Sequence, residues 1–125
     1  MTNITIEATS NTPWADFDKN GLLKLEGRSF PAIASEYYDP LIEFAAGLNT
    51  PCVSFDINLE YINTASSKKL LFLLNALDEN KNIGSVQVNW FYEEGDDDSI
   101  ETAEIFEDSL KRIRFTYNEV AEVSS

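Results

Sequence analysis

The sequence predicts an α/β domain in which helices pack on a mixed β-sheet. Segments with apolar residues at every second position alternate along the chain with segments in which apolar residues recur every three or four positions. The connections between them are short, and no internal repeat or linker interrupts the order. With 125 residues, of which 43% are hydrophobic, the chain is long and apolar enough for one buried core, so we expect a single domain over residues 1–125.

The first part of the chain is predicted to form a short strand and then a β-hairpin. Residues 3–8 alternate in the strand period, and Pro13 interrupts the pattern. Asn20 and Gly21 precede a second β-like run over residues 22–27. An Asn-Gly pair between two such runs is typical of a hairpin turn in which both residues take a positive φ.

A helix and the most regular strand of the sequence are expected next. Residues 35–48 have helical spacing, with Ser35 placed to cap the helix, although Pro40 also allows a start at the proline itself. Residues 52–60 alternate strictly between apolar and polar side chains. The apolar members of this strand are expected to face the core: Val53, Phe55, Ile57 and Leu59.

The remaining segments repeat the alternation of helix and strand. A polar junction over residues 61–67 leads to a leucine-rich helix over 68–81 and a strand over 85–92. An amphipathic helix over 99–110 and an edge strand over 112–117 follow, and residues 118–125 are expected to form a loose tail.

Charge and composition exclude several classes of function. The formal net charge is -13, and such a surface repels nucleic-acid phosphates and anionic lipids. The chain has no histidine, so a Ser-His-Asp unit, a Cys-His unit or a histidine-ligated zinc site cannot be built. No nucleotide-binding motif is present either, and we expect no enzymatic activity and no cofactor.

The only cysteine and the amino terminus bear on location. Cys52 lies in an apolar-alternating run and is expected to be a buried structural thiol. The first ten residues lack the basic and apolar regions of a signal peptide, and no apolar run approaches the roughly 20 residues of a membrane span. We therefore expect a cytoplasmic protein that is not inserted in a membrane.

The polar junction carries the first candidate site. Its hydroxyl groups lie where a strand ends and a helix is expected to begin, and helix N-termini attract anions. A phosphate on Thr64 would be held there by backbone N–H groups, with Lys68 one turn further along. The residues allow a second interpretation, in which Asn63, Thr64 or Ser66 simply caps the helix.

Residues 93–98 form an acidic run that suggests a cation site. Hard cations need several carboxylate oxygens, but the run lacks the alternating ligands and closing glutamate of an EF-hand loop. We favour a solvated acidic loop that caps the next helix. The carboxylates Asp56 and Glu60 are explained by the polar face of their strand.

Four blocks of sequence resemble one known family in the same order along the chain. Residues 59–70, Leu-Glu-Tyr-Ile-Asn-Thr-Ala-Ser-Ser-Lys-Lys-Leu, resemble the L-x-Y-[FIL]-N-[ST]-[SA]-S segment of SiaC-type bacterial regulatory phosphoproteins. Residues 6–9 and 12–13 resemble the opening of that family, residues 27–31 its G-x-S-[YF]-P segment, and residues 89–94 with 96–98 its W-[YF]-Y-E-x-D-D segment, which Gly95 interrupts. The chain departs from the family at Ala32-Ile33, where Glu-Asn is common, so its choice of partner is expected to differ.

The resemblance implies a fold similar to the STAS domains of anti-sigma-factor antagonists and a non-enzymatic switch. It implies that a Ser/Thr kinase phosphorylates Thr64, that a PP2C-like phosphatase removes the phosphate, and that the unphosphorylated protein binds and activates a diguanylate cyclase in cyclic-di-GMP and biofilm regulation. Around the switch we place Asn63, Ser66, Ser67 and Lys68.

Two other functions are retained as alternatives to this switch. The first is a generic anti-sigma-factor antagonist that binds a switch kinase. The second, which is the less favoured, is a metal-dependent hydrolase that uses residues 96–98 and Glu101.

Overall fold

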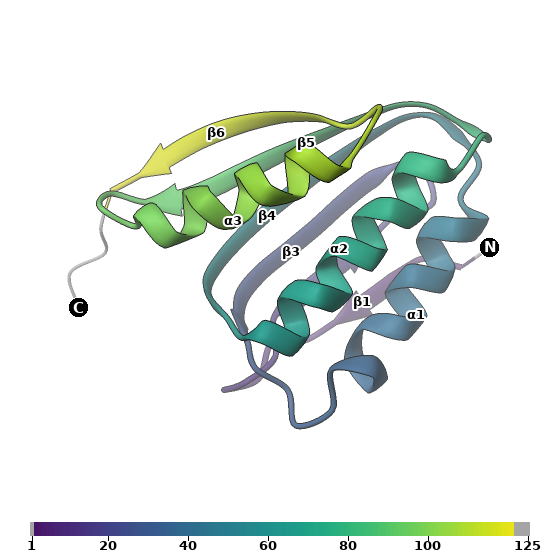
Figure 1. Cartoon of the computed structure of the whole chain (residues 1–125). Helices are drawn as coiled ribbons and strands as arrows, with labels where there is room; N and C mark the ends of the chain where they lie inside the picture. The colour runs from purple at the N-terminus through teal and green to yellow at the C-terminus, as the bar shows by residue number, and fades with distance from the viewer. Residues whose placement is uncertain (1, 122–125) are drawn as a thin grey trace.

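A computed structural model describes residues 2–121, and these form one sheet of six strands with three helices (Figure 1). The elements in chain order are β1 (Ile4–Ile6), β2 (Trp14–Phe17), β3 (Leu22–Ser29), α1 (Ala34–Gly47), β4 (Thr50–Ile62), α2 (Thr64–Glu79), β5 (Ile83–Glu93), α3 (Asp97–Ser109) and β6 (Arg114–Val120). The strands lie in the order β1-β2-β3-β4-β5-β6, antiparallel up to β3 and parallel from β3 onward. The predicted α/β class, the mixed sheet and the order of the elements are confirmed.

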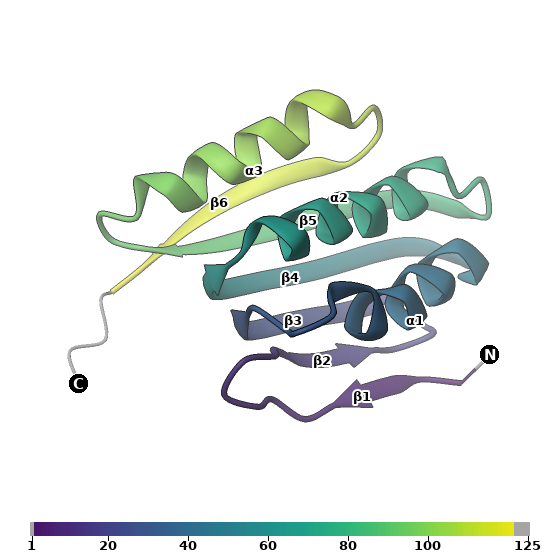
Figure 2. The ribbon, with the colours of Figure 1, turned by 60° about the horizontal axis from the view of Figure 1, so that its bottom comes forward.

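All three helices lie on the same face of the sheet (Figure 2). This follows from the topology, because each helix crosses from one parallel strand to its next neighbour in the same direction, and such crossovers are right-handed. The opposite face is covered by no helix within residues 2–121. No helix of the described chain is both long and apolar enough to cross a membrane.

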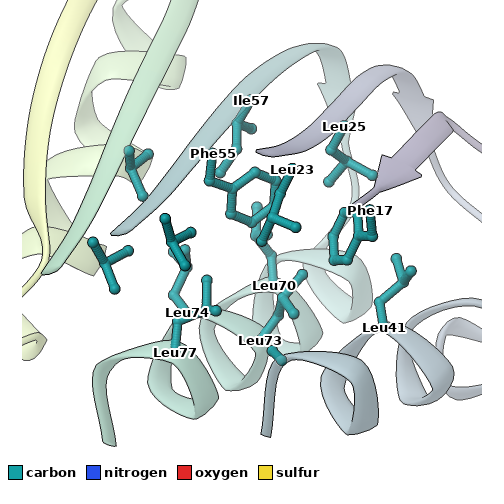
Figure 3. Close-up of a cluster of buried hydrophobic side chains, with 14 of the residues drawn as sticks. Phe17, Leu23, Leu25, Leu41, Phe55, Ile57, Leu70, Leu73, Leu74 and Leu77 are labelled. Atoms are coloured by element: carbon teal, nitrogen blue, oxygen red, sulfur yellow. The ribbon is translucent and has the colours of Figure 1, made fainter. Parts of the chain in front are cut away.

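Most of the core lies between the sheet and the helices α1 and α2 (Figure 3), and Ala103 and Phe106 of α3 belong to the same cluster. Phe17 stands edge-on to Phe44 and Phe55, with ring centroids 5.7 and 5.4 Å apart, and so joins β2, α1 and β4. The leucines of α2 fill the space beneath β3 and β4, and the four β4 side chains expected to face the core are buried. These leucines are Leu70, Leu73, Leu74 and Leu77.

The hairpin between β2 and β3 is confirmed, but its turn differs from the predicted one. Among the described residues no amino acid other than glycine has a positive φ, so Asn20 is not part of a two-residue turn. The turn has four residues, and it is closed by the Gly21 N–H, which donates to the Asp18 carbonyl at 2.9 Å. Gly21 has φ of +96°, and a Cβ atom there would overlap the carbonyl oxygen of Cys52, so this position requires glycine.

All three predicted helix starts differ from the observed ones, and α3 begins at Asp97 rather than at residue 99. The first helix begins at Ala34, after Ile33, whose side chain makes no capping hydrogen bond, and Pro40 lies inside it. The buried side chains of Tyr38 and Leu41 hold this part of α1 against the core, which offsets the N–H that the proline lacks. The second helix begins at Thr64 rather than at residue 68, because Asn63 caps it.

Two further expectations are corrected by the structure. Cys52 is exposed, because its neighbour Val53 faces the core and alternation turns Cys52 to the uncovered face of β4. Residues 118–120 belong to β6 and not to a loose tail, since they pair with β5 as far as Glu93 opposite Val120. The rest of the predicted tail, beyond residue 121, lies outside the described residues.

Candidate functional site

The candidate site lies where β3 and β4 end and the helices α1 and α2 begin. The two strands are parallel, so their carboxyl ends meet at one edge of the sheet. The loop between β3 and α1 lies beside the start of α2 (Figure 1), and Figure 2 shows the same arrangement. The Asn63 N–H donates to the Ser29 carbonyl at 2.9 Å and fixes the start of α2 against β3.

Asn63 is the cap of α2. Its side-chain oxygen accepts a hydrogen bond from the Ser66 N–H at 2.8 Å, and its carbonyl accepts one from the Ser67 N–H at 2.9 Å. Of the three residues that the sequence allowed as caps, the structure thus selects Asn63. The hydroxyl of Thr64 is not needed for capping.

Thr64 is the first residue of α2, and it is exposed to solvent. Lys68 is also exposed and lies one turn further on, so the two share a face of the helix. Helical side chains lean toward the N-terminus, so the side chain of Lys68 is long enough to reach Thr64. The next residue, Lys69, is engaged elsewhere, in an ion pair with Asp39 of α1 at 2.7 Å.

The two serines of this segment have different surroundings. Ser67 is half-buried, whereas Ser66 is completely buried and its hydroxyl has no hydrogen-bond partner in the described part of the chain. Beneath the helix start, the hydroxyls of Ser29 and Tyr38 lie 2.6 Å apart, and burial raises the pKa of Tyr38 to about 12. Ser66 thus belongs to the interior, and it is not available for direct contact with a partner.

Three side chains near Asn63, the residue before Thr64, were not singled out from the sequence. Arg28, Phe30 and Tyr61, together with Asn63, line a hollow of about 400 Å³. The Arg28 guanidinium lies over the Phe30 ring, 5.4 Å from its centroid, and Phe30 stands edge-on to Tyr61 at 5.7 Å. Their joint position depends on the pairing of β3 with β4, which no local pattern reveals.

The acidic run begins α3. The Asp96 side chain accepts a hydrogen bond from the Ser99 N–H at 3.1 Å, and Asp97 and Asp98 occupy the first turn. The predicted capping role is therefore confirmed. No group of three or more potential metal-ligating side chains is found in the described chain. On β4, the Asp56 carboxylate accepts a hydrogen bond from the Asn89 side chain at 2.8 Å.

Comparison with known proteins identifies relatives over nearly the whole chain. The family described as SiaC family regulatory phosphoprotein matches residues 6–120. An uncharacterized protein of Pseudomonas aeruginosa is 30% identical over 112 residues, which cover 85% of this chain and 88% of that protein.

Solved structures of Pseudomonas aeruginosa SiaC have the same fold. Apo-SiaC is 25% identical with a TM-score of 0.80, and the match covers 94% of this chain and 99% of that one. A second match is found in the complex of the diguanylate cyclase SiaD with its activator SiaC, with 24% identity and a TM-score of 0.82 over 94% of this chain and 99% of that one.

Proposed function

The chain belongs to the SiaC family of regulatory phosphoproteins, and from this premise we propose that it is a non-enzymatic switch that binds and activates a diguanylate cyclase. In this proposal a Ser/Thr kinase phosphorylates Thr64 in the cytoplasm, and a PP2C-like phosphatase reverses the modification. The unphosphorylated form is the activator, which links the switch to cyclic-di-GMP and biofilm regulation.

The observation that carries the proposal is the position of Thr64. Its side chain is exposed at the first position of a 16-residue helix, and Asn63 already performs the capping. A kinase can therefore modify this hydroxyl without opening the core or removing a cap. The phosphate adds a charge of about -1.5 to -2 at neutral pH, and it does so where the N-terminal helix dipole is positive.

Exposed apolar side chains at or just after the carboxyl ends of β3 and β4 provide a surface that a partner can bury. Ile33, in the loop before α1, is 52% exposed, and Tyr61, at the end of β4, is 50% exposed. Burial of such side chains is a main source of binding free energy, whereas a phosphate next to them would have to lose its water. Phosphorylation of Thr64 thus opposes binding without any change of fold. Ala32 and Ile33, where the family commonly has Glu-Asn, are exposed on this surface, so we propose that the chain differs from its relatives in its choice of partner.

Co-purification from the native cells tests the proposal. The tagged chain and its Thr64→Asp variant are isolated, and bound proteins and phosphorylated sites are identified by mass spectrometry. We expect the wild type to retain a diguanylate cyclase and to carry phosphate on Thr64, and the variant to lose the cyclase. Ser85→Asp is the matched control, since Ser85 is exposed at the opposite edge of the sheet.

Two results would contradict the proposal. Capture of an anti-sigma kinase without a cyclase would favour the antagonist alternative. Equal recovery of the cyclase with both aspartate variants, together with an absence of phosphate on Thr64 across growth conditions, would reduce Thr64 to the first residue of a capped helix.

A further inference from the structure

We propose that Arg28 is the residue that binds the phosphate of phosphorylated Thr64, and that it leaves the Phe30 ring to do so. This inference rests on the proposed phosphorylation of Thr64 and adds the receptor for the phosphate group within the same chain. Phosphorylation would then alter the aromatic hollow that Asn63 lines as well as the charge of Thr64.

The backbone brings Arg28 to the start of α2. Arg28 pairs with Tyr61 across β3 and β4, and the register shifts between Gly27 and Arg28, so that Glu60 is an extra residue in β4. Such bulges redirect the side chains next to them, often beside functional sites. Arg28 and Asn63 line the same hollow, and Thr64 is the next residue after Asn63.

The Arg28 guanidinium is held only weakly in the unmodified protein. Arg28 is exposed to solvent, lies over the Phe30 ring and makes no ion pair within residues 2–121. Charge-assisted hydrogen bonds from a guanidinium to a phosphate are stronger than this contact and are often bidentate. A dianion at Thr64 would therefore draw Arg28 away from Phe30.

The other charged groups around Thr64 do not replace Arg28. Lys69 is paired with Asp39, and Lys68 is exposed and flexible, with an ammonium group that acts as a point charge. Glu60 is exposed one residue before Tyr61 and carries the same sign of charge as the phosphate. Among the described residues that line the hollow, Arg28 is thus the only planar donor that is always charged.

The release of Arg28 has a consequence for the binding surface. Phe30 stands edge-on to Tyr61, so loss of the guanidinium from the Phe30 ring changes the environment of both rings. Tyr61 belongs to the exposed apolar surface that we propose a cyclase buries. The phosphate would therefore act on the partner surface through the hollow in addition to its own charge.

A phosphate titration tests this inference without the native kinase or cyclase. Phosphothreonine is incorporated at position 64 during translation, and its pKa is measured by phosphorus NMR in the wild type, in Arg28→Gln and in Lys68→Gln. Arg114→Gln is the matched control, because Arg114 is exposed at the start of β6, at the opposite edge of the sheet. Melting of the unmodified variants confirms that each one folds.

A cation that binds the dianion lowers the pKa of the phosphate. We expect Arg28→Gln to raise this pKa by about half a pH unit or more, which is roughly a three-fold change in proton affinity, with Arg114→Gln equal to the wild type. We also expect the Nε–H resonance of Arg28 to move on phosphorylation. Equal pKa values in the wild type and Arg28→Gln, or a rise in Lys68→Gln alone, would overturn the inference.

These outcomes are separate from those of the proposed switch. If phosphorylated and unmodified protein bind the cyclase equally well, the switch fails even where Arg28 holds the phosphate. If Arg28→Gln leaves the phosphate pKa unchanged but phosphorylation still abolishes binding, the switch stands and the role of Arg28 is wrong.

Discussion

The helices α2 and α3 both begin at the carboxyl edge of the parallel strands, and both are capped in the same way. Asn63 accepts the N–H of Ser66 at 2.8 Å, and Asp96 accepts the N–H of Ser99 at 3.1 Å. In each case the residue before the helix satisfies the third helical N–H group. Both helix starts thus use the same kind of capping hydrogen bond, from a helical N–H group to the side chain of the residue before the helix.

The two starts differ in charge and in what their serines do. The first turn of α3 contains Asp97 and Asp98, and the hydroxyl of Ser99 accepts a hydrogen bond from the buried Trp90 at 2.9 Å. The first turn of α2 contains no acidic residue and exposes Thr64. The start of α3 therefore already contains carboxylates and a hydrogen bond to the core, whereas the start of α2 has room for an added anion.

The largest expected effect concerns Trp90, which joins β5 to α3 through its contacts with Ser99 and Phe106. Trp90→Ala should lower the free energy of unfolding by about 3–5 kcal/mol, because it removes a large buried side chain that packs against Phe106. Trp90→Phe keeps a six-membered aromatic ring but loses the hydrogen bond to Ser99, and this loss should lower the free energy of unfolding by about 1 kcal/mol. Urea unfolding measures both, with Thr64→Ala, expected within about 0.5 kcal/mol of the wild type, as the control.

If Thr64→Ala destabilised the protein as much as Trp90→Ala, the contrast between the two helix starts would be wrong. Thr64 would then be part of the structural framework and not a surface site.

The second effect separates the exposed apolar side chains near each helix start. Tyr61→Ala should weaken binding to the cyclase about thirty-fold, or about 2 kcal/mol, as expected for a central aromatic residue of an interface. Ile105, on α3, is 66% exposed, and Ile105→Ala should leave the affinity unchanged. Titration calorimetry with the captured cyclase measures both, and a stronger effect at Ile105 would move the binding surface to α3.

The third effect tests the feature that the two starts share. Asn63→Ala and Asp96→Ala should each lower the free energy of unfolding by about 1 kcal/mol, because each leaves a helical N–H group without its cap. Chemical denaturation of the two variants provides the values. No loss in either variant would mean that the capping hydrogen bond contributes nothing to stability at that helix start.

The smallest effect separates the caps by charge. Asp96→Asn keeps a capping oxygen but removes a negative charge from the start of α3, and it should cost about 0.3–1 kcal/mol at low ionic strength. The loss should shrink in 1 M salt, since the Debye length falls to about 3 Å. A loss that is independent of salt would show that geometry, and not charge, distinguishes Asp96 from Asn63.

Periodicity predicted the order of the elements and the buried face of β4, because both depend on local spacing. It missed the start of α2, since Thr64, Ser66 and Ser67 are polar and give no apolar stripe, while the single side chain of Asn63 determines where the helix begins. The exposure of Cys52 was within reach of the same alternation, because Val53 faces the core and turns Cys52 to the other face, but the general tendency of free cysteine to be buried favoured the opposite expectation.

The hollow lined by Arg28, Phe30, Tyr61 and Asn63 depends on contacts between segments far apart in the sequence. Arg28 and Phe30 come from β3 and the residue after it, whereas Tyr61 comes from β4, and only the parallel pairing of these strands brings them together. One signal was present in the sequence. Two short motifs each follow a predicted strand directly, and the carboxyl ends of neighbouring parallel strands meet at one edge.

The central claim is that phosphate on Thr64 controls the binding of a diguanylate cyclase, and a direct affinity measurement tests it. The chain is prepared with threonine and with phosphothreonine at position 64, and both forms are titrated into the captured cyclase. We expect the phosphorylated form to bind at least about ten-fold more weakly, which corresponds to about 1.4 kcal/mol, while its melting temperature shows that the fold is retained. Equal affinities of the two folded forms would contradict the claim.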